Sequence, residues 1–479
     1  MIGQTVSRFR QDEGAAMKLL LNLLLVICIS ADAFAAETPD APKREARDLF
    51  AHVISLKTSE GLAQVPVMAS YLSDKLIAAG FDPKDIHIFP VGETASLVVR
   101  YRGDGTGGKP ILLLAHMDVV TANPADWERD PFTLIEENGY FFGRGTSDIK
   151  ADVSLIVATF LRLKREGFVP NRDLIIAFTG DEESDQRTTS DLVNNHRDLI
   201  DAEFALNGDG GGGVLDEATG KARIYYLQGA EKTSATYAIT AHNPGGHSSE
   251  PRVENAIYDL ADALKALQSF RFPVQSNEWT LGSLAAAGAA TPGKLGDAMK
   301  RFAADPADKA AADVLAIEPS YVGRTRTTCI ATMLKGGHAE NALPQSATAT
   351  VNCRIFPGTT IEAVKAELQR VVGNKVDVQI AERTMDAVAS PLREDIQSAV
   401  AAAVHANHPG TPIVPDQASY YTDGTIFRAA GIPTYGVSSN FLKDSDSFAH
   451  GLDERLPVDA FYGGLEHWYV LIQTLAGGH

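Results

Sequence analysis

The sequence predicts an α/β protein built around a mostly parallel sheet that is flanked by helices. Two observations carry this prediction. Short apolar runs alternate with helical patterns through the first half of the chain, and polar residues follow the runs where strands would end. With 479 residues, 44% of them hydrophobic, the chain is also long enough for a second domain.

Strand and helix patterns follow one another from residue 61 onward. Residues 61–80 place apolar side chains at helical spacing and end at a glycine. The next expected strands are 95–101, 110–114 and 173–178, and the next expected helices are 152–164 and 189–195. This strand–helix alternation predicts a parallel sheet covered on both faces.

From about residue 232 the order changes to strand, helix, strand, strand, helix, strand, which is typical of a small two-layer α+β domain. The expected elements are 234–241, 256–270, 327–334, 347–355, 361–371 and 375–380. We therefore expect a large domain formed by 37–232 and 384–479, with a smaller domain inserted at 233–383. The Ala- and Gly-rich segment 281–317 within the insertion is expected to be partly helical, and no chemistry is assigned to it.

Charge and the N-terminal residues limit the partners and the location of the protein. A formal net charge of -18 opposes binding to nucleic acid or to anionic membrane surfaces. Residues 19–29 form an apolar run after Lys18 and before small residues, which is the order of a secretory signal peptide and too short for a permanent anchor. We expect a signal peptide over 1–35, cleaved near Ala35, with Met17 as the true start. The mature protein would be periplasmic or secreted, without a stable membrane anchor.

Two cysteines remain after removal of this segment. Cys329 and Cys353 lie in neighbouring strand patterns that could pair antiparallel. In an exported protein they form either a cross-strand disulfide or two buried thiols, and the sequence leaves both alternatives open.

A series of His, Asp and Glu residues follows the buried strand patterns. Carboxylates mixed with imidazoles suit a divalent transition metal, and strand ends are where open α/β sheets bind ligands. The adjacent Glu182 and Glu183 point in different directions, so that one can bind metal while the other faces the reacting water. The series predicts a metallohydrolase. Its members are His116, Asp118, Asp148, Glu182, Glu183, Asp209 and His450.

Four segments of the chain resemble the M20 metallopeptidase family, which includes glutamate carboxypeptidases, aminoacylases and succinyl-diaminopimelate desuccinylases. They are Leu114-Ala115-His116-Met117-Asp118-Val119-Val120, Gly143-Arg144-Gly145 with Asp148-Ile149-Lys150, Gly180-Asp181-Glu182-Glu183, and Gly245-Gly246-His247-Ser248-Ser249. The first motif and residues 127–132 are most similar to the carboxypeptidase S branch. One departure is Ala151, where the family usually has glycine.

The resemblance implies a dizinc exopeptidase-like catalytic domain with an inserted lid and dimerisation domain. It implies two Zn²⁺ ions, for which Co²⁺ or Mn²⁺ can substitute. Asp148 would bridge the ions, with Glu183 and His450 on one of them and His116 and Asp209 on the other. Asp118 would orient His116, and Glu182 would be the general base.

By the same resemblance, substrate contacts come from the inserted domain. His247 would stabilise the oxyanion, reaching the neighbouring subunit's active site in dimeric members. Arg354 and Asn341 would bind a free substrate carboxylate, and Gly424 would line the pocket. The inserted domain favours a homodimer, whereas the segment 281–317 would cover the pairing surface, so that the oligomeric state stays open.

The function predicted from these residues is the cleavage of an amide bond next to a free carboxylate. The first hypothesis is a carboxypeptidase that acts on peptides, and the alternative is an aminoacylase or other N-acyl amino-acid hydrolase. A non-catalytic binding protein on the same scaffold is disfavoured, because such a protein has no physical need for a base beside a complete metal shell. The side-chain preference of the substrate cannot be read from the sequence.

Overall fold

A computed structural model describes residues 41–477 of the chain. Two compact units are distinguished, Met1–Glu45 and Ala46–His479. Of the first unit, only the start of helix α2 (Ala41–Ser55) is described, and the second unit contains all the other described elements. The predicted signal peptide over 1–35 and the predicted start at Met17 lie outside the described residues. Within 41–477, no helix is both long enough and apolar enough to cross a membrane.

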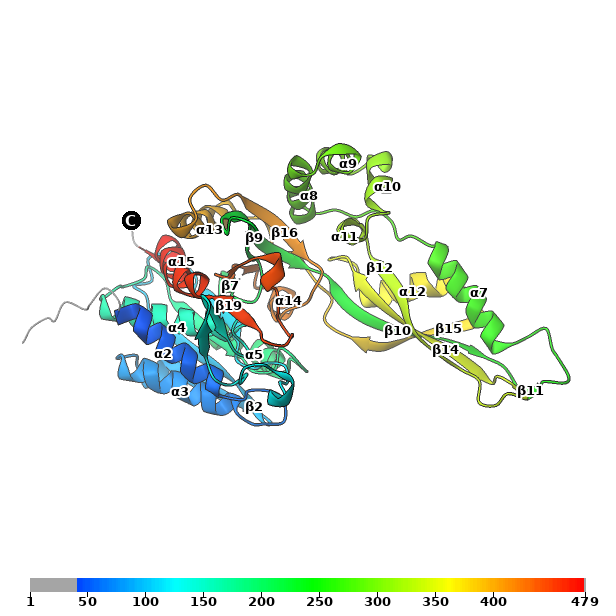
Figure 1. The fold of residues 1–479 in the computed structure, drawn as a ribbon, viewed down its shortest axis with the longest axis horizontal. Coiled ribbons are helices and arrows are strands. Elements are labelled where there is room, and N and C mark those ends of the chain that lie inside the picture. The colour runs from blue at the N-terminus through cyan, green and yellow to red at the C-terminus, as the bar shows by residue number, and fades with distance from the viewer. Residues whose placement is uncertain (1–40, 478–479) are drawn as a thin grey trace, which may run out of the picture. The chain divides into compact units, whose positions relative to one another are not determined.

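The centre of the large domain is a sheet of ten strands among the described residues (Figure 1). Its order is β1-β2-β6-β3-β7-β17-β9-β8-β18, and β16 pairs with β9. The inner strands β6, β3, β7 and β17 run parallel. The strands are β1 (Ile86–Val91), β2 (Thr94–Tyr101), β3 (Ile111–His116), β6 (Leu174–Thr179), β7 (Phe204–Asn207), β8 (Gly212–Leu215), β9 (Ala222–Glu231), β16 (Ile413–Ala418), β17 (Thr434–Gly436) and β18 (Phe441–Leu442).

The inner strands are buried on both faces, which explains their uninterrupted apolar sequences. On β3, Ile111 and Leu113 pack into one core cluster, whereas Leu112 and Leu114 pack into the cluster on the other face. Helices α2, α3 (Val65–Ala78), α4 (Lys150–Arg165), α13 (Glu394–Asn407) and α15 (Val458–Ala476) contribute to the first cluster. Helices α5 (Arg187–Asn195), α6 (Arg197–Ile200) and α14 (Gly424–Ala429) contribute to the second. The predicted α/β fold class is confirmed.

A second, antiparallel sheet begins at residue 233, after Lys232 alone separates it from β9. Its order is β12-β14-β10-β15, and α7 (Ala256–Ser269) and α12 (Ile361–Val372) share its core (Figure 1). The strands are β10 (Thr233–His242), β12 (Thr328–Gly336), β14 (Ser346–Ile355) and β15 (Val376–Arg383). A two-stranded ribbon of β11 (Gly246–His247) and β13 (Ala342–Leu343) continues from this sheet. Burial alternates residue by residue along β10, because only one face is covered.

Four helices lie between α7 and β12: α8 (Glu278–Ala290), α9 (Gly293–Ala304), α10 (Lys309–Leu315) and α11 (Pro319–Val322). They have a small core of their own. The first of them is anchored on the large domain, because Trp279 is fully buried in the core of that domain and donates a hydrogen bond from Nε1 to the Ser390 carbonyl at 2.7 Å. The segment 281–317 is mostly helical. Trp279, which lies just before it in the chain, attaches it to the large domain.

Shorter elements complete the large domain. The strands β4 (Ile135–Glu137), β5 (Tyr140–Phe142) and β19 (Arg455–Pro457) form a three-stranded sheet. Three single turns of 3-10 helix span Pro83–Asp85, Pro124–Asp126 and Asp444–Asp446.

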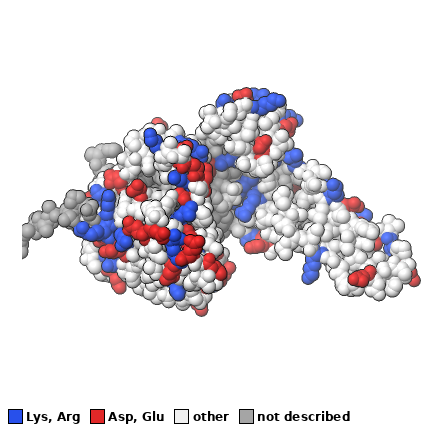
Figure 2. Space-filling model, viewed as in Figure 1, with Lys and Arg blue, Asp and Glu red and all other residues white. Residues whose placement is uncertain are grey.

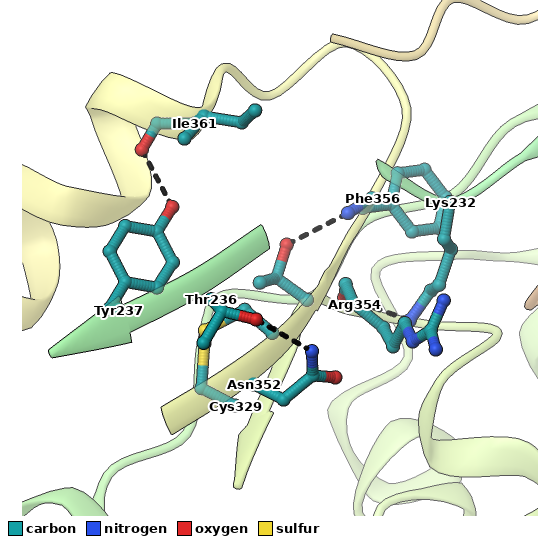
Figure 3. Close-up of a disulfide and its surroundings, with 10 residues drawn as sticks. Lys232, Thr236, Tyr237, Cys329, Asn352, Arg354, Phe356 and Ile361 are labelled. Carbon is teal, nitrogen blue, oxygen red and sulfur yellow. Dashed lines mark hydrogen bonds between the residues drawn. A yellow bond between two sulfur atoms is a disulfide. The ribbon is translucent and has the colours of Figure 1, made fainter. Parts of the chain in front are cut away.

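Cys329 and Cys353 form a disulfide between β12 and β14 (Figure 3). The two residues face each other directly in the antiparallel register, with Cα atoms 4.1 Å apart. Of the two alternatives that the sequence leaves open, the structure has the disulfide.

Candidate metal centre

The site forms at the carboxyl ends of three neighbouring parallel strands. His116 is the last residue of β3, Glu182 and Glu183 follow β6, and Asp209 follows β7. Because β3 lies between β6 and β7, these strand ends bring the four side chains to one edge of the sheet.

Asp148 and His450 reach the same place from loops. The Asp148 carboxylate lies between the two imidazoles, with Oδ1 3.1 Å from Nε2 of His116 and Oδ2 3.2 Å from Nε2 of His450. Nε2 of His450 is also 2.9 Å from Oε1 of Glu183, and Nε2 of His116 is 4.0 Å from Oδ2 of Asp209. All five predicted ligand residues thus lie in one cluster, with one oxygen of Asp148 toward each half of it.

The residues form two groups of possible metal ligands. One is His116, Asp148 and Glu183, the other is His116, Glu182 and Asp209, and in each group the ligand atoms lie within 4.8 Å of one another. With neutral imidazoles, the five predicted ligands bring three negative charges, which two divalent cations would offset. The donor set therefore fits a dinuclear centre of transition-metal ions.

The pKa values of the clustered side chains are shifted because their charges are buried close together. Burial raises the pKa of Asp209 well above its ordinary value, and Asp148 nearby raises it further. Burial likewise raises the pKa of Glu182 well above its ordinary value, with Asp209 adding to the effect. Hydrogen bonds to Asp148 and Glu183 raise the pKa of His450 to about 10. Cations at the ligand atoms would oppose both carboxylate shifts and would displace the proton from His450.

Asp118 contacts both His116 and the acidic pair. Its Oδ1 lies 3.4 Å from Nδ1 of His116, whereas its backbone carbonyl is closer to the same nitrogen, at 3.1 Å. The carboxylate also accepts hydrogen bonds from the backbone N–H groups of Glu182 at 3.2 Å and Glu183 at 3.0 Å. Asp118 thereby fixes the position of the loop that carries the acids, a role that the sequence did not indicate.

Glu454 is a further residue of the site that the sequence analysis missed. Its side chain is fully buried and forms an ion pair with Arg144 at 2.6 Å. It also accepts hydrogen bonds from the backbone N–H groups of Gly145, Ser147 and Asp148. Arg144 in turn donates to the carbonyl of Gly451, next to His450, at 3.0 Å. The pair therefore connects the loop of Asp148 with the loop of His450. Its sequence signal is an acid four residues after His450.

Asp423 lies behind the acidic pair, and the sequence analysis named only its neighbour Gly424. The Asp423 carboxylate accepts hydrogen bonds from the hydroxyls of Thr179 and Thr189, both at 2.5 Å. Burial raises its pKa to about 6. Gly424 is the buried first residue of α14, and its N–H donates to Thr422 Oγ1.

The three substrate-contact candidates of the second sheet are not brought to this cluster. Within residues 41–477, the hydrogen bonds and strand pairings of His247, Asn341 and Arg354 all involve residues 232–355. His247 is exposed on β11 beside Asn341, whose carbonyl accepts a hydrogen bond from Ser248. Arg354 lies near the opposite end of β14, beside Lys232 (Figure 3). At about 3.3 Å per residue, the strand from Ser346 to Arg354 separates these candidates by roughly 25 Å.

Comparison with known proteins places this geometry in a family. The model of peptidase family M20/M25/M40 matches residues 112–474. The chain belongs to this family. The resemblance seen in the sequence is thus confirmed, and the chain is a hydrolase of the M20 peptidase and amidohydrolase type, a metal-dependent family.

Several curated relatives match most of the length of this chain. N-fatty-acyl-amino acid synthase/hydrolase PM20D1 is 29% identical in Xenopus tropicalis, over 79% of this chain and 75% of the relative. The Homo sapiens protein of that name is 27% identical, over 87% and 86%. Probable carboxypeptidase S-like 2 of Dictyostelium discoideum is 27% identical, over 79% and 74%.

Solved structures share the fold at lower sequence identity. The M20 family metallo-carboxypeptidase Sso-CP2 of Sulfolobus solfataricus is 16% identical, with a TM-score of 0.64, over 90% of this chain and 99% of that one. The di-peptidase Dug1p of Saccharomyces cerevisiae is 17% identical, with a TM-score of 0.62, over 92% and 97%. The YXEP protein of Bacillus subtilis, described as a dinuclear metal binding peptidase, is 11% identical, with a TM-score of 0.58, over 90% and 98%.

Proposed function

We propose that this M20 hydrolase uses two zinc ions to cleave the amide bond of N-acyl amino acids. The observation that carries the proposal is the cluster of five ligand residues with Glu182 beside them. The acyl preference is supported by the PM20D1 relatives, which are named N-fatty-acyl-amino acid synthase/hydrolase. Carboxypeptidase action on peptides is the second candidate, supported by the carboxypeptidase S-like relative.

The side chains divide the chemistry among them. His116, Asp148, Glu183, Asp209 and His450 would hold the ions. When bound, two such ions polarise a scissile carbonyl and lower the pKa of water. Glu182 would take the proton from the attacking water and deliver it to the leaving amine. Asp118 would hold Glu182 in place through its backbone N–H and keep His116 oriented.

The role of Glu182 is tested by Glu182→Gln in zinc-loaded protein, assayed on a panel of N-acyl amino acids and dipeptides. We expect kcat to fall by at least 100-fold, because no carboxylate remains to accept the proton. Zinc content should stay unchanged. Asp185→Asn is the matched control, since Asp185 lies three residues along the same loop and its side chain is 67% exposed. Activity of Glu182→Gln within threefold of wild type would exclude Glu182 as the base. Turnover of dipeptides alone would favour the carboxypeptidase.

We also propose that the active enzyme is a homodimer in which the inserted domain, 233–383, acts as the lid. His247 and Asn341 lie on the exposed ribbon, whereas Arg354 lies where the second sheet joins the large domain. Because roughly 25 Å of strand separates the two places, one chain does not offer all three residues to one substrate. His247 and Asn341 would therefore serve the partner's site, and Arg354 the site of its own chain.

Mixing inactive variants tests this arrangement. His247→Ala and Glu182→Gln, mixed under conditions that exchange subunits, should recover about a quarter of wild-type activity, because half of the dimers are mixed and each has one complete site. Arg354→Ala mixed with Glu182→Gln should recover none, since each residue serves the site of its own chain and both sites of a mixed dimer then carry one defect. Recovery in the second mixture, or none in the first after exchange is verified by mass, would contradict the proposed division.

Export is a further proposal, supported by the order of residues at 17–36. Expression of the full chain, followed by fractionation and N-terminal mass analysis, should find a mature protein in the periplasm or medium that begins near Ala36. An intact N-terminus on cytoplasmic protein would contradict it.

A further inference from the structure

A cavity of about 680 Å³ lies away from the metal centre, between the helical insertion and the second sheet. Its walls come from the end of α7 and the loop after it, from residues 316–322 around α11, and from the first half of β12. Its volume is in the range of small-molecule sites. Most of the walls are apolar, formed in part by Leu264, Leu267, Phe270, Phe272, Val322 and Ile330.

The charge of the lining is opposite to that of the protein. Lys265, Arg271 and Arg326 line the cavity, and none of its described lining residues is an Asp or Glu. The whole chain has 61 acidic against 43 basic residues, and Figure 2 shows acidic side chains gathered on the drawn face of the large domain. A cationic, carboxylate-free cavity in such a protein favours an anionic ligand.

Most of the Arg326 guanidinium has no hydrogen-bond partner among the described residues. Arg326 is 6% exposed, and its Nε and Nη2 have no hydrogen-bond partner among the described residues. Burial lowers the pKa of Arg326, and the nearby positive charge of Arg271 lowers it further. The negative charge of Asp313 raises the pKa, but Asp313 and Arg326 form no ion pair among the described residues. Arg271 donates one hydrogen bond, from Nη1 to the Ala316 carbonyl. A buried guanidinium without partners is costly, and an anion in the cavity would offset that cost.

The apolar walls require more than a simple anion. Two exposed apolar residues, Ile317 at 69% and Ile330 at 65%, are among the lining residues, so that the cavity reaches the surface. An alkyl chain would cover these side chains, while its charged head group lies near the guanidinium groups. Guanidinium groups bind planar carboxylates in a bidentate manner.

We propose that this cavity binds a long-chain carboxylate, with its head group at Arg326 and Arg271 and its chain along α7 and β12. The site is separate from the hydrolytic centre and does not depend on the proposed reaction. Alkyl phosphates share the same chemistry of an anionic head on an apolar tail. The carboxylate is preferred because its planar oxygens match the guanidinium fork.

Calorimetric titration of the zinc-loaded enzyme with dodecanoate, below its micelle concentration, tests the proposal. We expect one site per chain. Arg326→Gln removes the charge, and Ala331→Trp fills the cavity from an exposed position on β12. Each should weaken binding at least tenfold while kcat/KM for a short-chain substrate stays within twofold. Arg301→Gln is the matched control, because Arg301 lies on α9 outside the cavity and pairs with Asp308.

The other ligands separate the alternatives. Dodecanol should bind at least tenfold more weakly than dodecanoate, and acetate should not bind. Equal binding of dodecanol would reduce the site to an apolar patch, and tighter binding of dodecyl phosphate would overturn the choice of a carboxylate. If neither variant affects dodecanoate binding and dodecanoate competes with substrate, then dodecanoate binds in the active site. If self-association of the protein abolishes dodecanoate binding, then a second copy of the chain occupies the cavity. Any of these results overturns the proposal.

Discussion

Glu454 shows how one buried carboxylate can organise a candidate metal site from outside the set of candidate ligands. It accepts three backbone hydrogen bonds from the loop that presents Asp148, and it neutralises Arg144. Arg144 in turn donates a hydrogen bond to the carbonyl of Gly451, the residue after His450. The loops of two candidate ligands, Asp148 and His450, therefore depend on one ion pair. Outer contacts of this kind fix the orientation of ligands and are nearly as important as the ligands themselves.

We expect Glu454→Gln to weaken both folding and metal binding. The substitution leaves Arg144 as a buried cation without its partner, which costs roughly 3–5 kcal/mol of unfolding free energy. Zinc affinity should fall by about 10–100-fold, because Asp148 and His450 lose their shared support. Chemical denaturation and zinc titration against a competing chelator measure the two effects. Glu466→Gln, at a side chain that is 44% exposed on α15, should change neither. An unchanged zinc affinity would restrict Glu454 to a purely structural role.

His467 is expected to make stability depend on pH. Burial lowers its pKa from 6.5 to about 4 in the folded protein, and its Nδ1 has no hydrogen-bond partner among the described residues. The unfolded chain therefore binds a proton at a higher pH than the folded chain. His467 alone should lower stability by about 3 kcal/mol as the pH drops from 6.5 to 4, and this contribution should not grow further below pH 4.

Denaturant unfolding at several pH values checks this prediction. In His467→Gln the contribution of this residue to the pH dependence between 6.5 and 4 should be absent, whereas His242→Gln, at an exposed residue, should retain it. Equal slopes for wild type and His467→Gln would contradict the assignment.

At the scale of elements, the sequence located buried strands and amphipathic helices within a few residues. The expected strand 95–101 is β2 (Thr94–Tyr101), and the expected helix 61–80 is α3 (Val65–Ala78), which begins just before Pro66. Strands outside the parallel centre of the sheet were harder to predict. β9, which pairs antiparallel with β8 and β17, is buried only in part, lacks the uninterrupted apolar pattern of β3 and was not predicted.

The helical insertion, α8 to α11, shows a different limit of prediction from sequence. Ala- and Gly-rich sequence indicates helix, but it does not indicate which surface the helix covers. The anchor is Trp279, just before the segment 281–317 that the composition marked. Its indole fits against Gly229 of β9, where a Cβ atom would lie 1.8 Å from the ring, so the contact depends on a glycine 50 positions earlier in the chain. A local pattern does not contain such a pairing.

Trp279→Ala is expected to destabilise the large domain by about 3–5 kcal/mol, because it leaves a cavity in the core and removes the hydrogen bond to Ser390. Leu295→Ala, at a partly buried residue of the small helical core, should cost less. Urea unfolding of both variants gives the comparison. Equal losses would mean that the insertion is not anchored through Trp279.

At the scale of the whole molecule, the clustering of the candidate ligand residues could be predicted because parallel strands end at one edge of a sheet. His116, Glu183 and Asp209 needed no knowledge of loop structure. Asp148 and His450 belong to the same predicted series, but their loops carry no periodic signal, and only the resemblance gave them roles beside the other ligands. The expected strand 347–355 already separates Arg354 from Asn341, whereas the position of His247 beside Asn341 could not be predicted, because it depends on the pairing of β11 with β13.

The same cluster should couple metal binding to the stability of the entire large domain. Three candidate ligand carboxylates, with Glu182 and Asp423 nearby, come from strands and loops distributed along the chain, so that their mutual repulsion affects the stability of the whole fold. Ions that bind only the folded protein stabilise it by about 4 kcal/mol when their concentration is 1,000 times Kd. Chelation should therefore lower the thermal midpoint, and added zinc should restore it. Glu182→Gln should keep the full zinc-dependent shift, whereas Asp148→Asn should lose most of it, because Asp148 faces both imidazoles. Equal midpoints with and without chelator, measured by scanning calorimetry on protein of known zinc content, would contradict a metal centre at these strand ends.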